Sequence, residues 1–383
     1  MDCQDRKVIY FTPGKMGPYH FARFTKLAQI YHDLLVVNIL WDDARRWQFT
    51  PGVLTDKIAV IENTADIKWK NRRVIEILEQ QNPEVIVLAG YNDPTQMTAA
   101  KWARKNKVPR ILHADSWYGD HPRYWLKELI KKFYFVKPNF NAAFVPGILG
   151  FKYINSLGIP KKAIWRGLYV VDNDYFFRAS AAARQECESW RRKLGLPQNY
   201  FLTVTRFIAK KNLPGLIRAF KKYRDSGGTW DLVIVGSGPE EIQIRDLANS
   251  ILTQGLSFVG WQQSQELPVY YGLAKCFILP SISEPWGLVV NEAMACGLPV
   301  LVSRNCGCFP ELCHRGINGF DFDPLDADEL ACLMLRISNG TLDLESMGAA
   351  SLSIIANYSL ETWALALQDC IETTISRFGA PVL

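Results

Sequence analysis

The sequence contains no run of about 18 apolar residues, so it offers no segment of the length that spans a bilayer as a helix. Its N-terminus, MDCQDRKVIYFTPG, lacks the apolar h-region of a secretory signal peptide. It also has no low-complexity tract, and 48% hydrophobic with 21% charged residues is typical of a globular protein. These absences predict a cytoplasmic chain.

The cysteines form neither a disulfide framework nor a common zinc motif. Nine is an odd number, and without a secretory signal we expect free thiols. Cys306, Cys308, Cys313 and His314 do cluster, but the spacing C-x-C-x4-C-H matches none of the common structural zinc sites. We therefore expect these thiols to pack in a loop and to bind no metal.

The charge is distributed unevenly along the chain. The net charge of +6 divides into +11 for residues 1–170 and −5 for residues 171–383. A basic front half favours an anionic surface or a phosphate-bearing substrate. Beyond this mild basicity no nucleic-acid-binding motif is present, so we expect no nucleic-acid partner.

Short β-branched runs alternate with helical patterns along the whole chain, which predicts an α/β fold. Runs that are apolar on both faces and joined by helices are typical of parallel sheets covered on both sides. The strands are expected at 7–12, 34–40, 84–89, 109–114 and 141–146 in the front half, and at 200–205, 231–236, 256–260, 275–280 and 298–303 in the back half. Two such sets predict two doubly wound, Rossmann-like domains.

The length of 383 residues also favours two domains over one core. We place the boundary at residue 170, which gives an N-terminal domain of residues 1–170 and a C-terminal domain of residues 171–358. A charged helix over 181–194 should lead into the second sheet. The C-terminal segment 359–383 contains an amphipathic helix that could pack back on the first domain. Ligands of such sheets bind at the carboxyl ends of the strands, so the cleft between two facing domains is the expected site.

Two glutamates, Glu284 and Glu292, stand in an otherwise apolar stretch, SISEPWGLVVNEAMACGLPV. Acidic side chains are rarely buried without a partner, so their placement suggests a function. Pro285 disfavours the helical conformation for Glu284, which should lie in an extended loop after the strand. Glu292 should lie in the second turn of the helix that follows.

This helix should begin at Trp286, Gly287 and Leu288, whose amides have no partner within the helix. Free amides at the positive end of the helix dipole bind anions, and a glycine lets a ligand approach the backbone closely. Two carboxylates for hydroxyls and amides for a phosphate suit a sugar nucleotide. The alternative is a capping Glu284 and a buried, neutralised Glu292.

Two further motifs follow strands of the second sheet. In TRFIAKKN, Arg206 directly follows a strand and Lys211 comes five residues later, so two cations suited to a diphosphate lie at the sheet edge. Lys210 is the competing candidate for Lys211, because charge counting does not separate them. In VGSGPEE, Gly236 begins a Gly-x-Gly turn that lacks the third glycine of a dinucleotide fingerprint, since position 241 is Glu. A glycine turn near a nucleotide is still expected.

The front half offers two candidate features at strand ends. The loop FTPGKMGPYHF places Gly14 and Gly17 before a helix, where their amides could approach a phosphate. His113 ends the strand PRILHA, and Asp115 follows two residues later. A lone histidine is more often structural than catalytic, but its place at a strand end keeps both interpretations open.

Taken together, these segments resemble the retaining glycosyltransferases of family 4, which have the GT-B fold. SISEPWGLVVNEAMACGLPVLVS is similar to the Glu-x7-Glu block of the family, TRFIAKKN to its Arg-x4-Lys element, and VGSGPE to its Gly-x-Gly-Pro-Glu turn. CGCFPELCHRGINGFDF resembles its Gly-x-x-Glu-Leu and Gly-x-Asn-Gly elements. The front half matches less well, because Gly17 is followed by proline and His113 is separated by one residue from its aspartate.

The resemblance implies transfer of a sugar from a nucleotide-diphosphate donor to a glycan, lipid-linked or small-molecule acceptor, with retained configuration. Glu284 would contact the hydroxyls of the donor sugar, and Glu292 the ribose. Arg206 and Lys211 would neutralise the diphosphate leaving group. Family enzymes need no metal or other cofactor, because these cations and a helix dipole offset the leaving-group charge.

The resemblance also implies roles for backbone groups. The amides of Gly287 and Leu288, with the Gly17 loop, would bind sugar and phosphate, and His113 would lie beside the sugar. Base recognition would use backbone contacts in FVGW, which contains Val259. The base of the donor, its sugar and the acceptor are therefore left open. The sequence DFD at 321–323 mimics a metal-binding Asp-x-Asp, but we interpret it as coincidence in an acidic surface strand.

Two other classes of function compete with this one. Another GT-B enzyme, such as an epimerase or a phosphorylase, would use a similar site. The second competing class is a membrane-surface binding protein with an idle transferase site. The segment HPRYWLKELIKKFYFVKP (121–138) suggests it, because it is basic and aromatic, as in an interfacial helix. An ordinary domain helix is the plainer interpretation of that segment. An enzyme acting on a lipid-linked or lipopolysaccharide acceptor at the inner face of the membrane would reconcile both.

Overall fold

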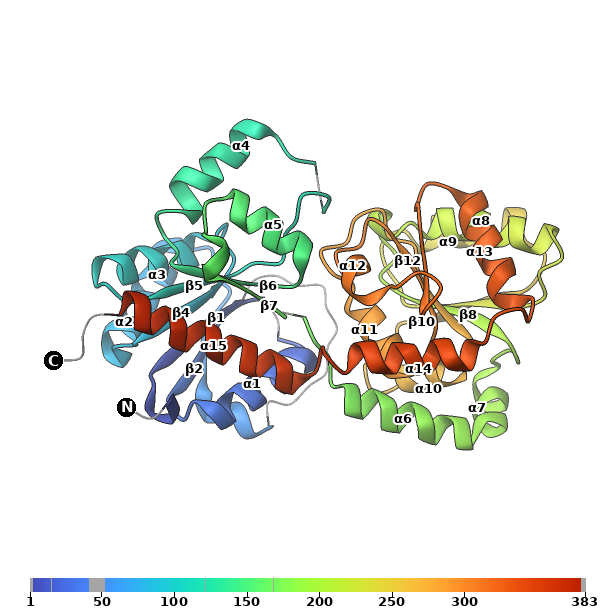
Figure 1. Cartoon of the computed structure of the whole chain (residues 1–383), viewed down its shortest axis with the longest axis horizontal. Helices are drawn as coiled ribbons and strands as arrows, with labels where there is room; N and C mark the ends of the chain where they lie inside the picture. Colours follow the sequence, from blue (N-terminus) through green and yellow to red (C-terminus); the bar gives the residue numbers. More distant parts are fainter. Residues whose placement is uncertain (1–2, 15, 41–51, 121, 168, 380–383) are drawn as a thin grey trace. The chain divides into compact units, whose positions relative to one another are not determined.

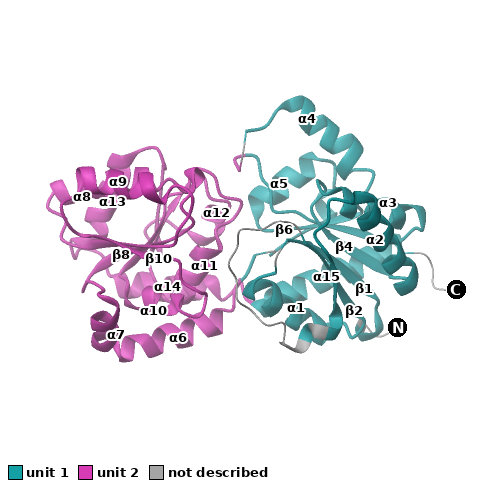
Figure 2. Ribbon diagram, turned by 180° about the vertical axis from the view of Figure 1, so that it is seen from behind, with its two compact units in different colours: residues 1–118, 122–170, 360–383 teal, residues 119–121, 171–359 magenta. Residues whose placement is uncertain are grey.

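The computed structural model describes residues 3–14, 16–40, 52–120, 122–167 and 169–379. The chain divides into two compact units, coloured separately in Figure 2. Unit 1 comprises Met1–Tyr118, Pro122–Val170 and Leu360–Leu383, and unit 2 comprises Gly119–His121 and Val171–Ser359. Among the described residues, none of the helices has both the length and the apolar character needed to cross a membrane.

Unit 1 is a parallel sheet of seven strands in the order β3-β2-β1-β4-β5-β6-β7 (Figure 1). The strands are β1 (Val8–Pro13), β2 (Leu34–Ile39), β3 (Ile58–Ile61), β4 (Val85–Ala89), β5 (Arg110–His113), β6 (Ala142–Val145) and β7 (Ile164–Arg166). Its helices are α1 (Pro18–Ile30), α2 (Ile67–Gln81), α3 (Pro94–Lys105), α4 (Trp125–Ile130), the π-helix η3 (Lys131–Val136), α5 (Ile148–Ser156) and α15 (Leu360–Phe378). Short 3₁₀ turns lie at η1 (Cys3–Asp5), η2 (Gly52–Lys57) and η4 (Lys161–Ala163).

Unit 2 is a parallel sheet of six strands in the order β10-β9-β8-β11-β12-β13. The strands are β8 (Tyr200–Val204), β9 (Asp231–Val235), β10 (Leu256–Gly260), β11 (Cys276–Leu279), β12 (Val300–Ser303) and β13 (Gly319–Phe322). The helices are α6 (Asn173–Gln185), α7 (Cys187–Leu194), α8 (Leu213–Asp225), α9 (Glu241–Ile251), α10 (Leu267–Leu273), α11 (Leu288–Ala295), α12 (Phe309–Leu312), α13 (Ala327–Ser338) and α14 (Leu344–Ile355), and η5 (Ala209–Lys211) is a 3₁₀ turn.

The predicted strands are present in both sheets, and the central ones are buried on both faces, as β8 shows at every position. Two strands of unit 1, β3 and β7, were not predicted. They have four and three residues and form the two edges of the sheet, where part of each strand remains exposed. An edge strand needs no continuous apolar run, so the sequence carries little signal for it.

The helix predicted over 181–194 is two helices in the structure. The first, α6, begins at Asn173, because the carboxylate of Asp172 accepts the amide hydrogen of Tyr175 at 3.0 Å and caps the helix. A break at Glu186 separates α6 from α7. The helical segment therefore starts three residues after the domain boundary predicted at residue 170.

The C-terminal helix α15 packs on unit 1, although it follows unit 2 in the sequence. Trp363 is 1% exposed and contacts Phe144 of β6 edge-to-face. Polar contacts fix the helix further along its length: Tyr31 donates to Glu372 at 3.0 Å, and the Trp165 indole donates to Asp369 at 2.7 Å. The chain thus returns to the first unit to complete its core.

We predict that Trp363→Ala destabilises unit 1 by about 3–5 kcal/mol, because it removes a large buried side chain and leaves a cavity. Leu365→Ala on the same helix is the matched control, since Leu365 is 52% exposed. It should change the free energy of unfolding by less than about 0.5 kcal/mol. Hydrogen exchange of the β6 amides measures both; equal loss of protection in the two variants would contradict the packing of α15.

Candidate functional site

The topology of unit 2 brings together the two motifs that carry its charged candidates. Strand β8 lies between β9 on one side and β11 on the other. The strand order therefore reverses at β8. The loops that follow β8 and β11 leave the carboxyl edge of the sheet next to each other. Such a switch point is where open parallel sheets bind ligands.

At this edge Lys211 and Glu284 are paired. The Lys211 ammonium donates to a carboxylate oxygen of Glu284, and the two side chains are only 13% and 12% exposed. The two loops are also joined through the backbone, because the amide of Ile282 donates to the carbonyl of Lys210 at 2.9 Å. The geometry thus distinguishes the two lysines: Lys211, and not Lys210, has its ammonium at the glutamate.

The backbone of Glu284 is fixed on both sides. Its amide donates to the carbonyl of Asn305 at 3.2 Å, and its own carbonyl accepts the amide of Gly307 at 2.9 Å. It forms an isolated parallel bridge with Cys306, which places it in an extended segment as the following Pro285 predicts. A carboxylate on so constrained a segment keeps its position without a ligand.

Arg206 lies on the neighbouring loop with its side chain exposed. No carboxylate of the described residues pairs with it, so its charge is available to a ligand. The loop is held by the Gly-x-Gly turn after β9, where the amide of Phe207 donates to the carbonyl of Ser237 at 2.9 Å. The position of Arg206 therefore depends on that turn.

The glycines of this turn have a structural reason of their own. A Cβ at Gly236 would lie 1.8 Å from the carbonyl oxygen of Thr205, and one at Gly238 would lie 2.5 Å from that of Phe207. Gly236 also has a φ of 138°, in the region that favours glycine. The turn thus needs glycine to pack against the Arg206 loop, and a direct role for Gly236 in donor binding stays a prediction.

Helix α11 begins at Leu288 with Gly287 as its N-cap at φ 110°. This φ is strained for any residue with a Cβ, so the tight turn from β11 favours glycine, and a Cβ there would also lie 2.8 Å from a methyl of Leu279. Within the described part of the chain, the amides of Gly287, Leu288 and Val289 have no acceptor. The helix thus begins two residues later than the predicted start at Trp286, and Gly287 and Leu288 are two of the three residues whose amides were predicted to be free beside Glu284.

Trp286 and Glu292 point into unit 2. Trp286 is 2% exposed, and its indole donates to Asn291 at 2.9 Å. Glu292 is 1% exposed and accepts the hydroxyl hydrogen of Tyr271, on α10, at 2.7 Å. This contact supplies the partner that a buried carboxylate needs. The predicted roles of Trp286 in donor binding and of Glu292 at a ribose stay predictions.

Val259 lies half-buried in β10, next to Gly260. The carbonyl of Gly260 accepts the amide of Gly236 at 2.8 Å, so this strand end adjoins the Gly-x-Gly turn. A base-binding role of this segment also stays a prediction.

The cysteine cluster is packed as a set of thiols. Cys306, Cys308 and Cys313 are buried, and burial raises the pKa of Cys313 to about 12. A zinc site needs thiolates, and no group of three metal-ligating side chains occurs in the residues described.

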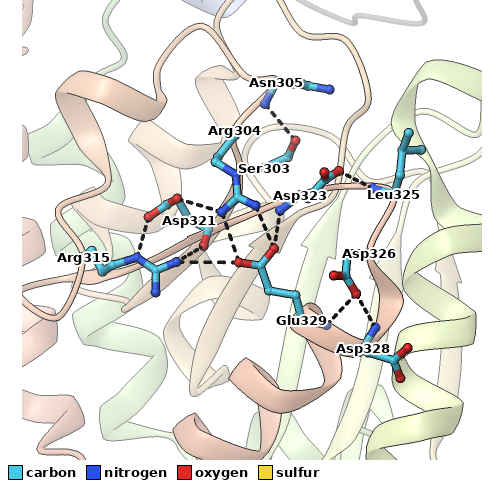
Figure 3. Close-up of polar contacts among 10 residues, drawn as sticks. All are labelled: Ser303, Arg304, Asn305, Arg315, Asp321, Asp323, Leu325, Asp326, Asp328 and Glu329. Carbon is cyan, nitrogen blue, oxygen red and sulfur yellow. Dashed lines mark hydrogen bonds and ion pairs between the residues drawn. The ribbon is translucent and has the colours of Figure 1, made fainter.

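The Asp-x-Asp sequence in β13 belongs to an ion-pair network (Figure 3). Asp321 accepts from Arg304 at 3.1 Å and from Arg315 at 2.9 Å, while Arg304 also contacts Glu329 at 2.8 Å. Burial alone would raise the pKa of Asp321, but the hydrogen bonds from the two arginines lower it below its usual value. Asp323 instead accepts the amide of Leu325 at 2.9 Å. Two arginines thus occupy the place that a cation would take.

In unit 1, His113 ends β5 and its Nδ1 is hydrogen-bonded to the hydroxyl of Tyr10 on β1. Burial, together with the nearby positive charge of Arg23, lowers the pKa of His113 to about 3. The imidazole is therefore neutral at physiological pH. Asp115 contacts a different group, accepting from Tyr169 at 3.0 Å.

The glycine loop after β1 is organised by its own contacts. The amide of Gly17 donates to Nδ1 of His20 at 3.2 Å, within the N-cap of α1. Asn38 donates to the carbonyl of Gly14 at 2.8 Å, and Gly14 has a φ of 75°. A phosphate that binds the Gly17 amide would have to displace the His20 imidazole. The role of Gly17 in phosphate binding stays a prediction.

Sequence reasoning missed the partners of these residues. Tyr10 and Tyr271 lie in apolar segments and give the signal of ordinary core residues. Arg23 offers a better signal: it stands among Phe21, Phe24 and Leu27 on the buried face of α1. A charge at a core-facing helix position indicates a special environment.

Comparison with known proteins identifies the second unit. Residues 186–351 match the family described as glycosyl transferases group 1. This segment is similar to the glycosyl transferases group 1 family. It contains all the site candidates of unit 2.

The chain is similar to the amylovoran biosynthesis glycosyltransferase AmsK of Erwinia amylovora, with 33% identity over 150 residues, or 37% of each chain. The O-antigen chain mannosyltransferase B of Escherichia coli is 26% identical over 84% of this chain and 87% of its own. The chain thus aligns with little more than a third of AmsK.

Solved structures show that the fold extends over both units. A glycosyltransferase from Rickettsia africae has a TM-score of 0.77 at 16% identity, covering 97% of this chain and 99% of its own. Anabaena HepE, solved in complex with UDP-glucose, has a TM-score of 0.76 at 17% identity, covering 96% and 99%. The predicted GT-B fold class is confirmed.

We predict that Gly236→Ala displaces the Arg206 loop. Gly227→Ala is the matched control, because Gly227 also has a positive φ, 88°, but no atom lies within 4 Å of the position that a Cβ would take there. The control should cost about 1 kcal/mol of unfolding free energy, and Gly236→Ala about 1–3 kcal/mol more from overpacking. Urea unfolding and exchange of the Phe207 amide test this; equal costs would show that the close approach is unimportant.

We also predict that His113 does not titrate between pH 8 and 4 in the folded protein. In urea its pKa should return to about 6.5. Between these two pKa values His113 is protonated in the unfolded chain and neutral in the folded chain. Protonation therefore favours the unfolded state, and the free energy of unfolding falls as the pH falls from about 6.5 towards 3. NMR of ring-labelled histidine, assigned with His113→Asn, measures this directly. A folded-state titration near pH 6.5 would contradict the burial of the ring.

Proposed function

We propose that this chain is a retaining glycosyltransferase, which moves a sugar from a nucleoside-diphosphate sugar to a hydroxyl-bearing acceptor. The observation that carries the proposal is the pairing of Lys211 with Glu284 beside the free amides of Gly287 and Leu288. Cation, carboxylate and helix-end amides at one switch point match the diphosphate and the hydroxyls of a sugar nucleotide. The family match of residues 186–351 supports the same class of donor.

In this reaction Lys211 and Arg206 stabilise the negative charge that develops on the diphosphate. The bond between the anomeric carbon and the diphosphate oxygen breaks, and a bond from the acceptor oxygen forms on the same face. The acceptor proton passes to the leaving phosphate oxygen. Glu284 holds the sugar hydroxyls and is not a nucleophile. Fixed donors and cations lower the barrier because they need no reorganisation as charge develops.

The two cations and the dipole of α11 supply the positive charge that a metal ion provides in other transferases. The transfer is accordingly metal-independent in this proposal, and the chain needs no cofactor. The Asp-x-Asp of β13 has no part in it, since Asp321 is already paired with Arg304 and Arg315.

Experiment has to identify the donor base and the acceptor, because the names of the relatives include different donors and acceptors. One relative is a GDP-mannose-dependent phosphatidylinositol monomannoside mannosyltransferase, and another is an alpha-monoglucosyldiacylglycerol synthase. HepE was solved with UDP-glucose. A glycan or a lipid-linked sugar is the acceptor class that we propose, as in the O-antigen mannosyltransferase.

We predict that incubation with UDP-, GDP- and ADP-sugars and a panel of acceptors gives nucleotide release that depends on the acceptor. Glu284→Gln should lower kcat/KM by about 10²–10³-fold, the loss typical of one electrostatic group of a site. Glu188→Gln, an exposed glutamate on α7, should leave it unchanged. Lys211→Ala should lower activity similarly, whereas the adjacent Lys210→Ala should have little effect.

Three controls make this test decisive. Thermal unfolding of Glu284→Gln establishes that the loss is not one of folding. EDTA should leave the rate unchanged, and NMR of the product should show the anomeric configuration of the donor. Epimerisation of a donor by itself, or turnover that needs only inorganic phosphate, would contradict transfer, and an inverted product would contradict retention.

A further inference from the structure

The exposed hydrophobic side chains of unit 1 are concentrated in one short segment. Eight of the 19 exposed large hydrophobic residues in the described chain lie between positions 124 and 135. They are Tyr124, Trp125, Leu126, Leu129, Ile130, Phe133, Tyr134 and Phe135. We call this segment, residues 122–137, the aromatic helix; His121 lies outside the described residues. So many neighbouring apolar side chains in water mark an interaction surface.

The aromatic helix buries almost nothing of its own. Helix α4 has no buried residue, and η3 buries only Val136. Figure 1 shows α4 at the periphery of unit 1, beyond α5. The side chains of Trp125 and Tyr134 are 71% and 73% exposed. An ordinary domain helix turns an apolar stripe towards the core, so the core does not explain these residues.

Four of the exposed apolar residues lie on one side of α4. Residues 125, 126, 129 and 130 are spaced at i, i+1, i+4 and i+5, which gathers them in a single arc, and Phe133 follows in the π-helix η3. Lys127 and Lys132 flank this arc, and their ammonium groups lie 5.2 Å from the Tyr124 ring and 5.7 Å from the Phe133 ring. Lysines beside an apolar face reach outward along it, as at a membrane interface.

The one acidic residue of the segment is turned inward. Glu128 accepts from Tyr153 at 2.8 Å and from Lys131 at 2.7 Å, and Arg123 lies 3.4 Å away. Burial alone would raise the pKa of Glu128, but the hydrogen bonds from Lys131 and Tyr153 lower it. The carboxylate thus anchors the helix to α5. The segment carries Arg123, Lys127, Lys131, Lys132 and Lys137 against this single acid.

The far end of the aromatic helix is anchored as well. Asn139 is 2% exposed and donates to the carbonyls of Tyr134 and Phe135, both at 3.0 Å. The backbone is therefore held at both ends while the apolar side chains project outward. This is a preformed surface, so little ordering is required when it binds.

We propose that the aromatic helix docks unit 1 on an anionic phospholipid bilayer. The apolar arc of α4, which includes Trp125, enters the boundary between head groups and acyl chains, together with Phe133 of η3. Lys127, Lys132 and Lys137 remain at the level of the lipid phosphates. Trp and Tyr favour this depth because their rings are apolar and their N–H and O–H groups are polar. The excess of positive charge selects an anionic surface over a neutral membrane or an uncharged protein.

Co-sedimentation of the full chain with vesicles tests the proposal, and it needs neither donor nor acceptor, so its outcome is independent of the proposed transferase activity. We expect binding to vesicles of phosphatidylcholine with 30% phosphatidylglycerol, taken here as roughly the anionic content that gives a strong surface potential. Binding should weaken at high salt and be much poorer on pure phosphatidylcholine.

Matched variants separate the apolar and the cationic contributions. Trp125→Ser with Phe133→Ser should abolish binding, whereas Ile242→Ser with Leu325→Ser, which are even more exposed and lie on unit 2, should not. Lys127→Glu with Lys132→Glu should weaken binding at least about 30-fold. The loss of each lysine should weaken it by about tenfold or less, and repulsion between the new glutamates and the anionic lipid adds to this. Lys101→Glu with Lys161→Glu, exposed elsewhere on unit 1, carries the same charge change as a control.

Several outcomes would overturn the proposal. Absence of binding to anionic vesicles would do so, and so would loss of binding in the control variants to the same extent. Self-association of the chain that is lost in Trp125→Ser with Phe133→Ser, without vesicle binding, would assign the surface to a second copy instead. Because the substituted side chains are exposed, or half-buried in the case of Lys132, unchanged melting temperatures should accompany every variant.

Discussion

The candidate site of unit 2 depends on the parallel pairing of β8 with β11, in which Phe201 lies beside Cys276 and Leu202 beside Phe277. These strands are separated by more than 70 residues of sequence, yet their carboxyl ends are neighbours. The pairing brings the Lys211 loop to the Glu284 loop. Without it, one motif would be a solvated lysine and the other an isolated acid.

Around this pairing, several features keep charged groups in place without a ligand. Glycine at 236 and 238 permits backbone approaches that a Cβ would block, and glycine at 287 permits a φ of 110°. The ion pair of Lys211 and Glu284 satisfies both groups in a poorly exposed position, which lowers the cost of burying them. Such a site is preorganised, and preorganisation is what electrostatic catalysis requires.

The two units differ in whether their candidate polar groups already have hydrogen-bond or ion-pair partners. In unit 1 the candidates His113 and Gly17 already have partners in Tyr10 and His20. In unit 2 the amides at the start of α11 and the Arg206 side chain have none among the described residues. The aromatic helix contributes +4 to the net charge of +11 of the basic front half, since it has five basic residues against Glu128.

The central strands and the placement of Glu284, Arg206 and Lys211 at strand ends were predictable from the sequence, because hydrophobic periodicity and proline act over a few residues. The contact of Glu292 with Tyr271, the support of the Arg206 loop by the Gly236 turn, and the packing of α15 on unit 1, which the sequence left open, required the folded chain. These contacts join residues distant in the chain, so they follow from strand order and packing, which local patterns do not encode.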